Sequence, residues 1–63
     1  MLLESDIDRA ARLMITSHGD MAAQVADRRA SDLRPRELPA AETWDRIAAA
    51  IRAIQNEAIT AIG

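Results

Sequence analysis

Apolar residues recur at intervals of three and four along almost the whole chain, and two short joints interrupt this pattern. The joints are His18-Gly19-Asp20 and the segment from Pro35 to Pro39. Glycine often takes the backbone conformation that ends a helix, and proline disfavours helix at the residue before it. The sequence therefore predicts one all-α domain over residues 1–63, with helices over about 5–18, 20–34 and 39–62.

The first predicted helix carries start signals in the segment Ser5-Asp6-Ile7-Asp8. Ser5 is the expected N-cap, and Asp8 follows it at the spacing of a capping box, near the positive end of the helix dipole. Asp8 and Arg12 are four residues apart, which favours an ion pair on the helix surface. The apolar stripe of this helix consists of Leu3, Ile7, Ala10, Ala11 and Met14.

The His-Gly-Asp joint holds the only histidine of the chain. Gly19 is in the position of a helix stop, and His18 beside it can interact with the last carbonyl groups of the helix. Asp20 is the expected N-cap of the following helix. We therefore interpret the joint as structural, although His18 could also belong to a site.

The third predicted helix is longer than the two that precede it. At 1.5 Å per residue it would span roughly 33 Å, against roughly 20 Å for each of the others. Two short helices packed on one long C-terminal helix cannot cover its whole length, so the sequence predicts self-association, with a dimer favoured. Glu42 and Arg46 are expected to form a further ion pair on this helix. The expected interface consists of Ile51, Ile54, Ile59 and Ile62.

Three polar residues fall on or near the apolar stripes, namely His18, Arg29 and Gln55. They could form an internal polar cluster. Alternatively, His18 caps the helix, Arg29 extends along the apolar surface to reach water, and Gln55 fixes the register of the helices. The single aromatic residue, Trp44, is expected to anchor the core, the alternative being an exposed contact for a partner protein.

The composition excludes several kinds of site. There is no cysteine, so neither a disulfide nor a thiolate zinc site can form. The chain also lacks a second histidine, a glycine-rich phosphate loop and a nucleophile motif, and we expect neither an enzyme nor a bound cofactor. Glu4, Asp6 and Asp8 could hold a metal only weakly, because they line an exposed helix start. No catalytic, cofactor-binding or metal-binding residue is assigned.

The charge balance bears on the partners. The net charge is −2 and the isoelectric point is about 5.1, which disfavours nucleic acids and anionic membranes. All eight basic residues are arginine, a usage typical of GC-rich bacterial genomes. No targeting segment or membrane span is evident, so a cytoplasmic location is expected. The favoured function is a non-enzymatic module that binds itself and an unidentified protein partner. The alternative is a small nucleic-acid-associated regulator that uses Arg28–Arg36.

Four short patterns also resemble a group of uncharacterised alphaproteobacterial proteins that share a domain of unknown function. The matching elements are Ala11-x3-Ile15, His18-Gly19-x2-Ala22, Ala26-x3-Ala30-x2-Leu33 and Trp44-x2-Ile47-x2-Ala50-Ile51. They cover the chain from about residue 10 to residue 52. The resemblance implies a small helical protein without an assigned activity, in which His18, Gly19 and Trp44 are family features.

Overall fold

The computed structural model describes the backbone of residues 3–62 and the side chains of residues 3–57. The elements are α1 (Glu4–His18), the short 3-10 helix η1 (Gly19–Met21), α2 (Ala22–Leu33) and α3 (Leu38–Ile62). No strand occurs in this part of the chain, which confirms the all-α class. Nor is any of the described helices long and apolar enough to cross a membrane.

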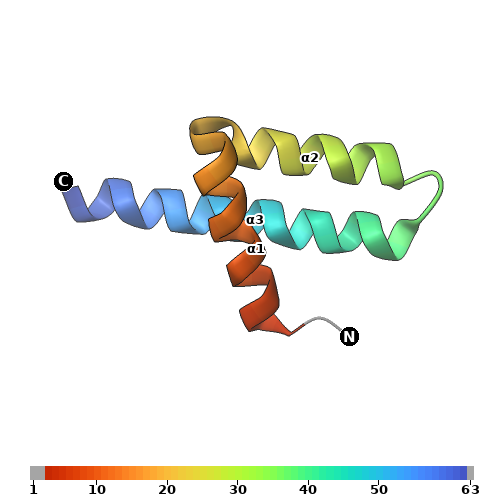
Figure 1. The fold of residues 1–63 in the computed structure, drawn as a ribbon, viewed down its shortest axis with the longest axis horizontal. Coiled ribbons are helices and arrows are strands. Elements are labelled where there is room, and N and C mark those ends of the chain that lie inside the picture. Colours follow the sequence, from red (N-terminus) through yellow and green to blue (C-terminus); the bar gives the residue numbers. More distant parts are fainter. Residues whose placement is uncertain (1–2, 63) are drawn as a thin grey trace.

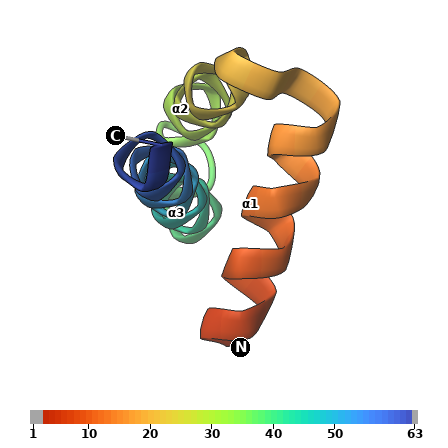
Figure 2. The same ribbon diagram turned by 90° about the vertical axis from the view of Figure 1, so that its left-hand side faces the viewer.

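α2 and α3 lie side by side and run in opposite directions, while α1 crosses them (Figure 1). Viewed along the α2–α3 pair, α1 lies on one side of both helices, and its N-terminal half extends past α3 (Figure 2). α3 has 25 residues and α2 has 12, so the C-terminal turns of α3 project beyond the other helices (Figure 1). The molecule measures 41 × 22 × 17 Å as a result.

The core lies where the three helical segments meet, and small residues dominate it. Five of its nine buried residues are alanines, so the helix backbones can approach closely. Ile51 is the largest fully buried side chain. The nine residues are Ile7, Ala11, Met14, Ala22, Ala23, Ala26, Ile47, Ala48 and Ile51.

The helix starts differ from the predicted ones. α1 begins at Glu4 with Leu3 as its N-cap, and the Leu3 amide donates a hydrogen bond of 3.2 Å to Asp6 Oδ2. The prediction of Ser5 as N-cap is therefore wrong, because the Asp6 carboxylate three residues after Leu3 binds the free amide instead. Asp20 is also not an N-cap, since it lies within η1 and Met21 precedes α2.

Gly19 ends α1, as predicted. Its φ is +56°, and its amide donates a hydrogen bond to the Ile15 carbonyl oxygen. A Cβ at this position would meet no atom within 4 Å, so backbone conformation and not space favours glycine here. The second joint begins where α2 ends at Leu33, and the amides of Arg36 and Glu37 both donate to the Leu33 carbonyl oxygen before α3 starts.

Candidate functional site

The structure does not bring His18, Arg29 and Gln55 together. Gln55 Nε2 donates a hydrogen bond of 3.2 Å to the carbonyl oxygen of Gly19, at the α1 end of the molecule. Arg29 lies on α2 with its guanidinium carbon 5.0 Å from the centre of the Trp44 ring. Because α2 and α3 are antiparallel, these two contacts lie at different ends of the helix pair (Figure 1). The His18 side chain is exposed.

Trp44 packs against the core without being fully buried. The exposed Arg29 covers part of its ring through a cation–π contact, an interaction typical of arginine. The tryptophan of α3 thus anchors the edge of the core on the side of α2, and part of its side chain remains exposed.

The predicted isoleucine interface is corrected at one position. Ile51 is 0% exposed and belongs to the core, because α3 turns this residue toward α1 and α2. It is therefore unavailable to a second molecule. Ile54 is half-buried and packs at the core margin. The side chains of Ile59 and Ile62 lie outside the described residues.

The arginine-rich segment Arg28–Arg36 is partly occupied by contacts within the chain. One terminal nitrogen of Arg34 donates hydrogen bonds to both carboxylate oxygens of Asp45, at 3.0 Å to Oδ1 and 2.9 Å to Oδ2. Arg29 lies on Trp44, as described above. Among the described side chains, Arg28 and Arg36 are outside any ion pair. Binding of nucleic acid by this segment stays a prediction. Two of the four arginines that it would use already have partners within the chain.

A second pair of charges links α2 to α3. Arg52 donates from both terminal nitrogens to the carboxylate of Asp27, 25 residues earlier. This hydrogen-bonded guanidinium lowers the pKa of Asp27 below its ordinary value, although partial desolvation of the carboxylate opposes the shift. The pair ties the middle of α2 to α3, and both side chains remain about half exposed.

We expect the Asp27–Arg52 pair to make a small contribution to the acid sensitivity of the fold. A carboxyl group whose pKa is lowered by folding stabilises the native state above its unfolded pKa. That stabilisation is lost as the pH falls from about 4 through the lower native pKa. In Asp27→Asn, the free energy of unfolding should therefore decline less between about pH 4 and pH 2 than in the wild type.

The measurement is urea unfolding followed by circular dichroism at a series of pH values. Asp32→Asn is the matched control, because Asp32 is exposed on the same helix and outside the ion pairs of the described residues. Parallel pH profiles for Asp27→Asn and the wild type would contradict the assignment. The effect should also weaken in high salt, since both charges are accessible to solvent.

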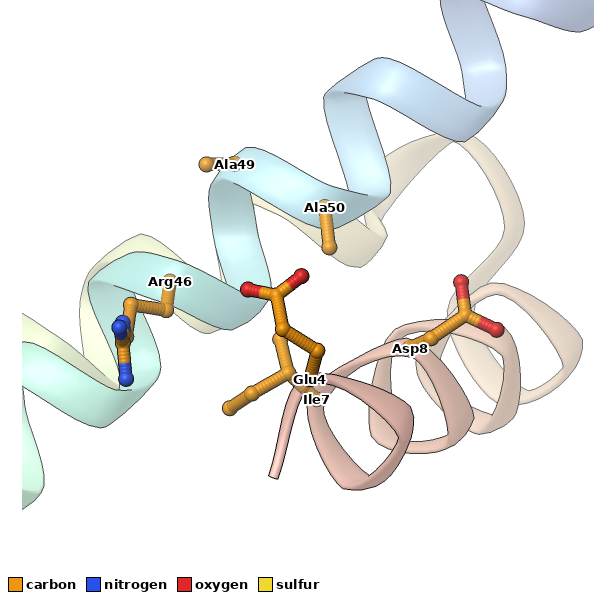
Figure 3. A pocket seen from close by; sticks show the side chains of 6 residues that line it. All are labelled: Glu4, Ile7, Asp8, Arg46, Ala49 and Ala50. Carbon is orange, nitrogen blue, oxygen red and sulfur yellow. The ribbon is translucent and has the colours of Figure 1, made fainter. Parts of the chain in front are cut away.

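An open groove of about 360 Å³ lies between the N-terminal half of α1 and the middle of α3 (Figure 3). α1 supplies three lining residues and α3 the other three, so that carboxylates face one arginine across an apolar floor. Asp8 is bound to Arg12 at 2.9 Å, as predicted. The lining residues are Glu4, Ile7, Asp8, Arg46, Ala49 and Ala50.

Arg46 is the cation of this groove. The predicted pair between Glu42 and Arg46 is absent, and no other ion pair involves Arg46 within residues 3–57. Leu3 lies one turn before Ile7 on the α1 stripe and is 62% exposed. The sequence analysis did not predict this groove. A signal was present, because the apolar stripe of the first helix continues to Leu3, beyond the part of α1 that packs on α3.

No grouping of histidine, cysteine or acidic side chains suitable for a metal ion occurs in the described part of the chain. No protein-family model matches the chain, and neither a curated protein nor a solved structure is significantly similar to it.

Proposed function

We propose that the protein is a non-enzymatic interaction module that self-associates through α3. The observation that carries this proposal is the length of α3 relative to its neighbours. Gln55 contacts the joint between α1 and α2, and the α3 backbone continues as helix to Ile62. These last turns project beyond α1 and α2 (Figure 1).

The sequence of the projecting segment supports a protein contact. Residues 53–62 read AIQNEAITAI and contain one charged residue, Glu57. The core positions Ile47 and Ile51 are followed at helical spacing by Ile54, residue 58 and residue 62, all of them apolar. Depletion of charge with retention of apolar residues is typical of the centre of an interface.

The exposed area of the chain also favours a second copy. A compact monomer of 6.9 kDa would expose about 4,000 Å². This chain exposes 4682 Å², roughly 700 Å² more than that expectation. A dimer of standard size buries about 800 Å² on each partner, which is close to the excess. Pairing of two chains would thus restore the burial that 63 residues do not reach alone.

The test is the mass in solution, measured by light scattering and sedimentation over about a hundredfold range of concentration. We expect a species of twice the 6.9 kDa chain mass at high concentration. Ile62→Glu should shift the equilibrium toward the monomer, because it places a charge in the apolar segment. A further protein partner would then compete with the second copy for α3.

Leu13→Glu is the matched control, since Leu13 is 62% exposed on α1 and the change adds the same charge. It should leave the association unchanged. A wild-type chain that is monomeric at every concentration would contradict the proposal. Equal weakening by both substitutions would instead show that association does not depend on α3 specifically.

A further inference from the structure

We infer that the projecting turns of α3 pair in antiparallel fashion with those of a second copy, so that the partner helix takes the place beside α3 where α2 ends. This inference rests on the proposed self-association and adds its face, direction and register. It starts from the side of α3 that packs on α2, because helical spacing continues this side beyond the α1–α2 joint.

The side of α3 that contacts α2 repeats every seven residues. Asp45 and Arg52 are seven positions apart, and each forms an ion pair with a residue of α2. Ala41 and Ala48 precede them by four positions, and at most 1% of each is exposed. Seven residues are close to two turns of a helix, so further steps of seven stay on this side, which we call the α2 side of α3.

The next steps of seven fall on the last turns of α3. Gln55 follows the two buried alanines, and its side-chain amide donates to the Gly19 carbonyl oxygen, just before α2 begins. Ile62 follows Gln55 by seven positions, and Ile59 takes the position that two charged residues hold in the earlier repeats. The α2 side of α3 is thus bordered by charges where α2 covers it and is apolar in sequence beyond α2.

The occupant of this apolar continuation is the same segment of a second copy. No helix of the described residues lies alongside the last turns of α3, whereas α2 lies alongside the turns before them (Figure 1). In a two-fold dimer each contact is matched by the reverse contact, so the apolar segment covers its own copy. When 55 lies opposite 62, 58 lies opposite 59, and both contacts occur twice.

The position of α2 determines the direction of pairing. In a parallel pair through this side, both α2 helices would lie between the two α3 helices. Packed helix axes are about 8–10 Å apart, so the projecting turns would then be held too far apart to touch. In the antiparallel pair, α2 of one copy and the projecting turns of the other lie end to end beside α3.

The α1–α2 joint determines the register. Because Gln55 binds the joint, a partner helix can run alongside α3 only from this level onward. The described helix ends at Ile62, so the two copies overlap over about 12 Å, at 1.5 Å per residue. A contact of this length is small, and we expect the dimer to dissociate on dilution. The same register places Ile62 in the contact that Ile62→Glu is designed to weaken.

Disulfide cross-linking tests this pairing, because the chain has no cysteine of its own. In Ala58→Cys the two new thiols lie next to the two-fold axis and should join on mild oxidation with diamide, since a disulfide needs Cα atoms within about 7 Å. The measurement is the rate at which a covalent dimer appears on a non-reducing gel. It is made at a concentration at which light scattering shows the reduced variant to be dimeric. Ile59→Cys has the same central position and is measured as a second variant.

The controls place the thiol elsewhere on α3. Ala53 is exposed on the opposite side of the helix, so Ala53→Cys makes the same substitution away from the contact. Cross-linking at 58 should be at least roughly tenfold faster than at 53, because thiols within the dimer have a high effective concentration. Ile62→Cys tests the direction. In the antiparallel pair the two positions 62 are separated by about 10 Å along the helices and should link slowly, whereas a parallel pair in register brings them together.

The outcomes separate this pairing from the proposed function. If cysteines at 58 and 59 link no faster than at 53 in a protein that dimerises, the pairing is wrong while the self-association stands. Linking at 62 as fast as at 58 overturns the antiparallel direction. A wild-type chain that is monomeric at every concentration overturns the proposed function, and this inference with it.

Discussion

Replacing Ile51 by alanine is expected to lower the free energy of unfolding by about 3 kcal/mol. Ile51 is 0% exposed, and it is the largest side chain that the core buries completely. The substitution removes apolar contacts and leaves a cavity, into which the neighbouring residues of α1 and α2 can relax only partly. Because the surrounding residues are mostly alanines, they have few side-chain atoms that could move into the space.

The consequence for the whole domain is large. Small domains bury a modest share of their surface, and stabilities of about 5–15 kcal/mol are usual for folded proteins. A loss of about 3 kcal/mol would remove much of the stability of a chain at the low end of that range. Thermal and urea unfolding by circular dichroism would show it, at one fixed protein concentration so that association does not differ between variants.

Leu13→Ala is the control for this substitution. Leu13 is also a large aliphatic residue in a helix, but it is 62% exposed. Its replacement should change the free energy of unfolding by less than about 0.5 kcal/mol. If Ile51→Ala and Leu13→Ala destabilised the protein equally, the placement of Ile51 in the core would be wrong.

The all-α fold class was accessible from the sequence because helical periodicity is a strong signal. Ile7, Ala11 and Met14 recur at the spacing that places them on one face, and the structure buries all three. Gly19 was predictable as a helix stop for a comparable reason, since a positive φ is costly for other residues. In both cases the property belongs to a single helix or residue and does not depend on distant parts of the chain.

Helix starts were harder to predict because several residues compete for the same role. The segment Glu4–Asp8 offers a serine and three acids within five positions, and each can bind a free amide. The alternatives differ by about 1 kcal/mol or less, so packing of the helix decides between them. Here α1 starts one residue before the predicted N-cap Ser5, and Asp6 binds the Leu3 amide.

The surface contacts depended on how the helices face each other, which spacing alone does not determine. Asp27 and Arg52 are 25 residues apart and meet only because α2 and α3 are antiparallel. The same arrangement sets Arg29 on Trp44 and separates it from Gln55. Residue spacing had placed Arg29 and Gln55 on or near apolar faces. It held no information on which ends of the two helices would lie together.

The alanine contact between α2 and α3 gives the second large expected effect. Ala22, Ala26 and Ala30 follow one another at intervals of four on α2, and each is at most 1% exposed. Replacing Ala26 by leucine adds side-chain atoms at a position without space for them. The free energy of unfolding should fall by about 1–3 kcal/mol or more, because the helices must separate or the new side chain must take a strained rotamer.

This substitution isolates packing from helix formation. Alanine and leucine both favour the helix strongly, so the isolated α2 segment is nearly unaffected by the change. Ser31→Leu adds a leucine to an exposed position of the same helix and should leave the stability unchanged or slightly higher. If Ala26→Leu were tolerated as well as Ser31→Leu, the small size of Ala26 would not be needed for the packing of α2 against α3. If Ala26→Leu lowers the free energy of unfolding and Ser31→Leu does not, the core does not accept a larger side chain. A destabilised Ile51→Ala variant would show that it does not accept a smaller one either. Both results together are the behaviour of a closely packed core.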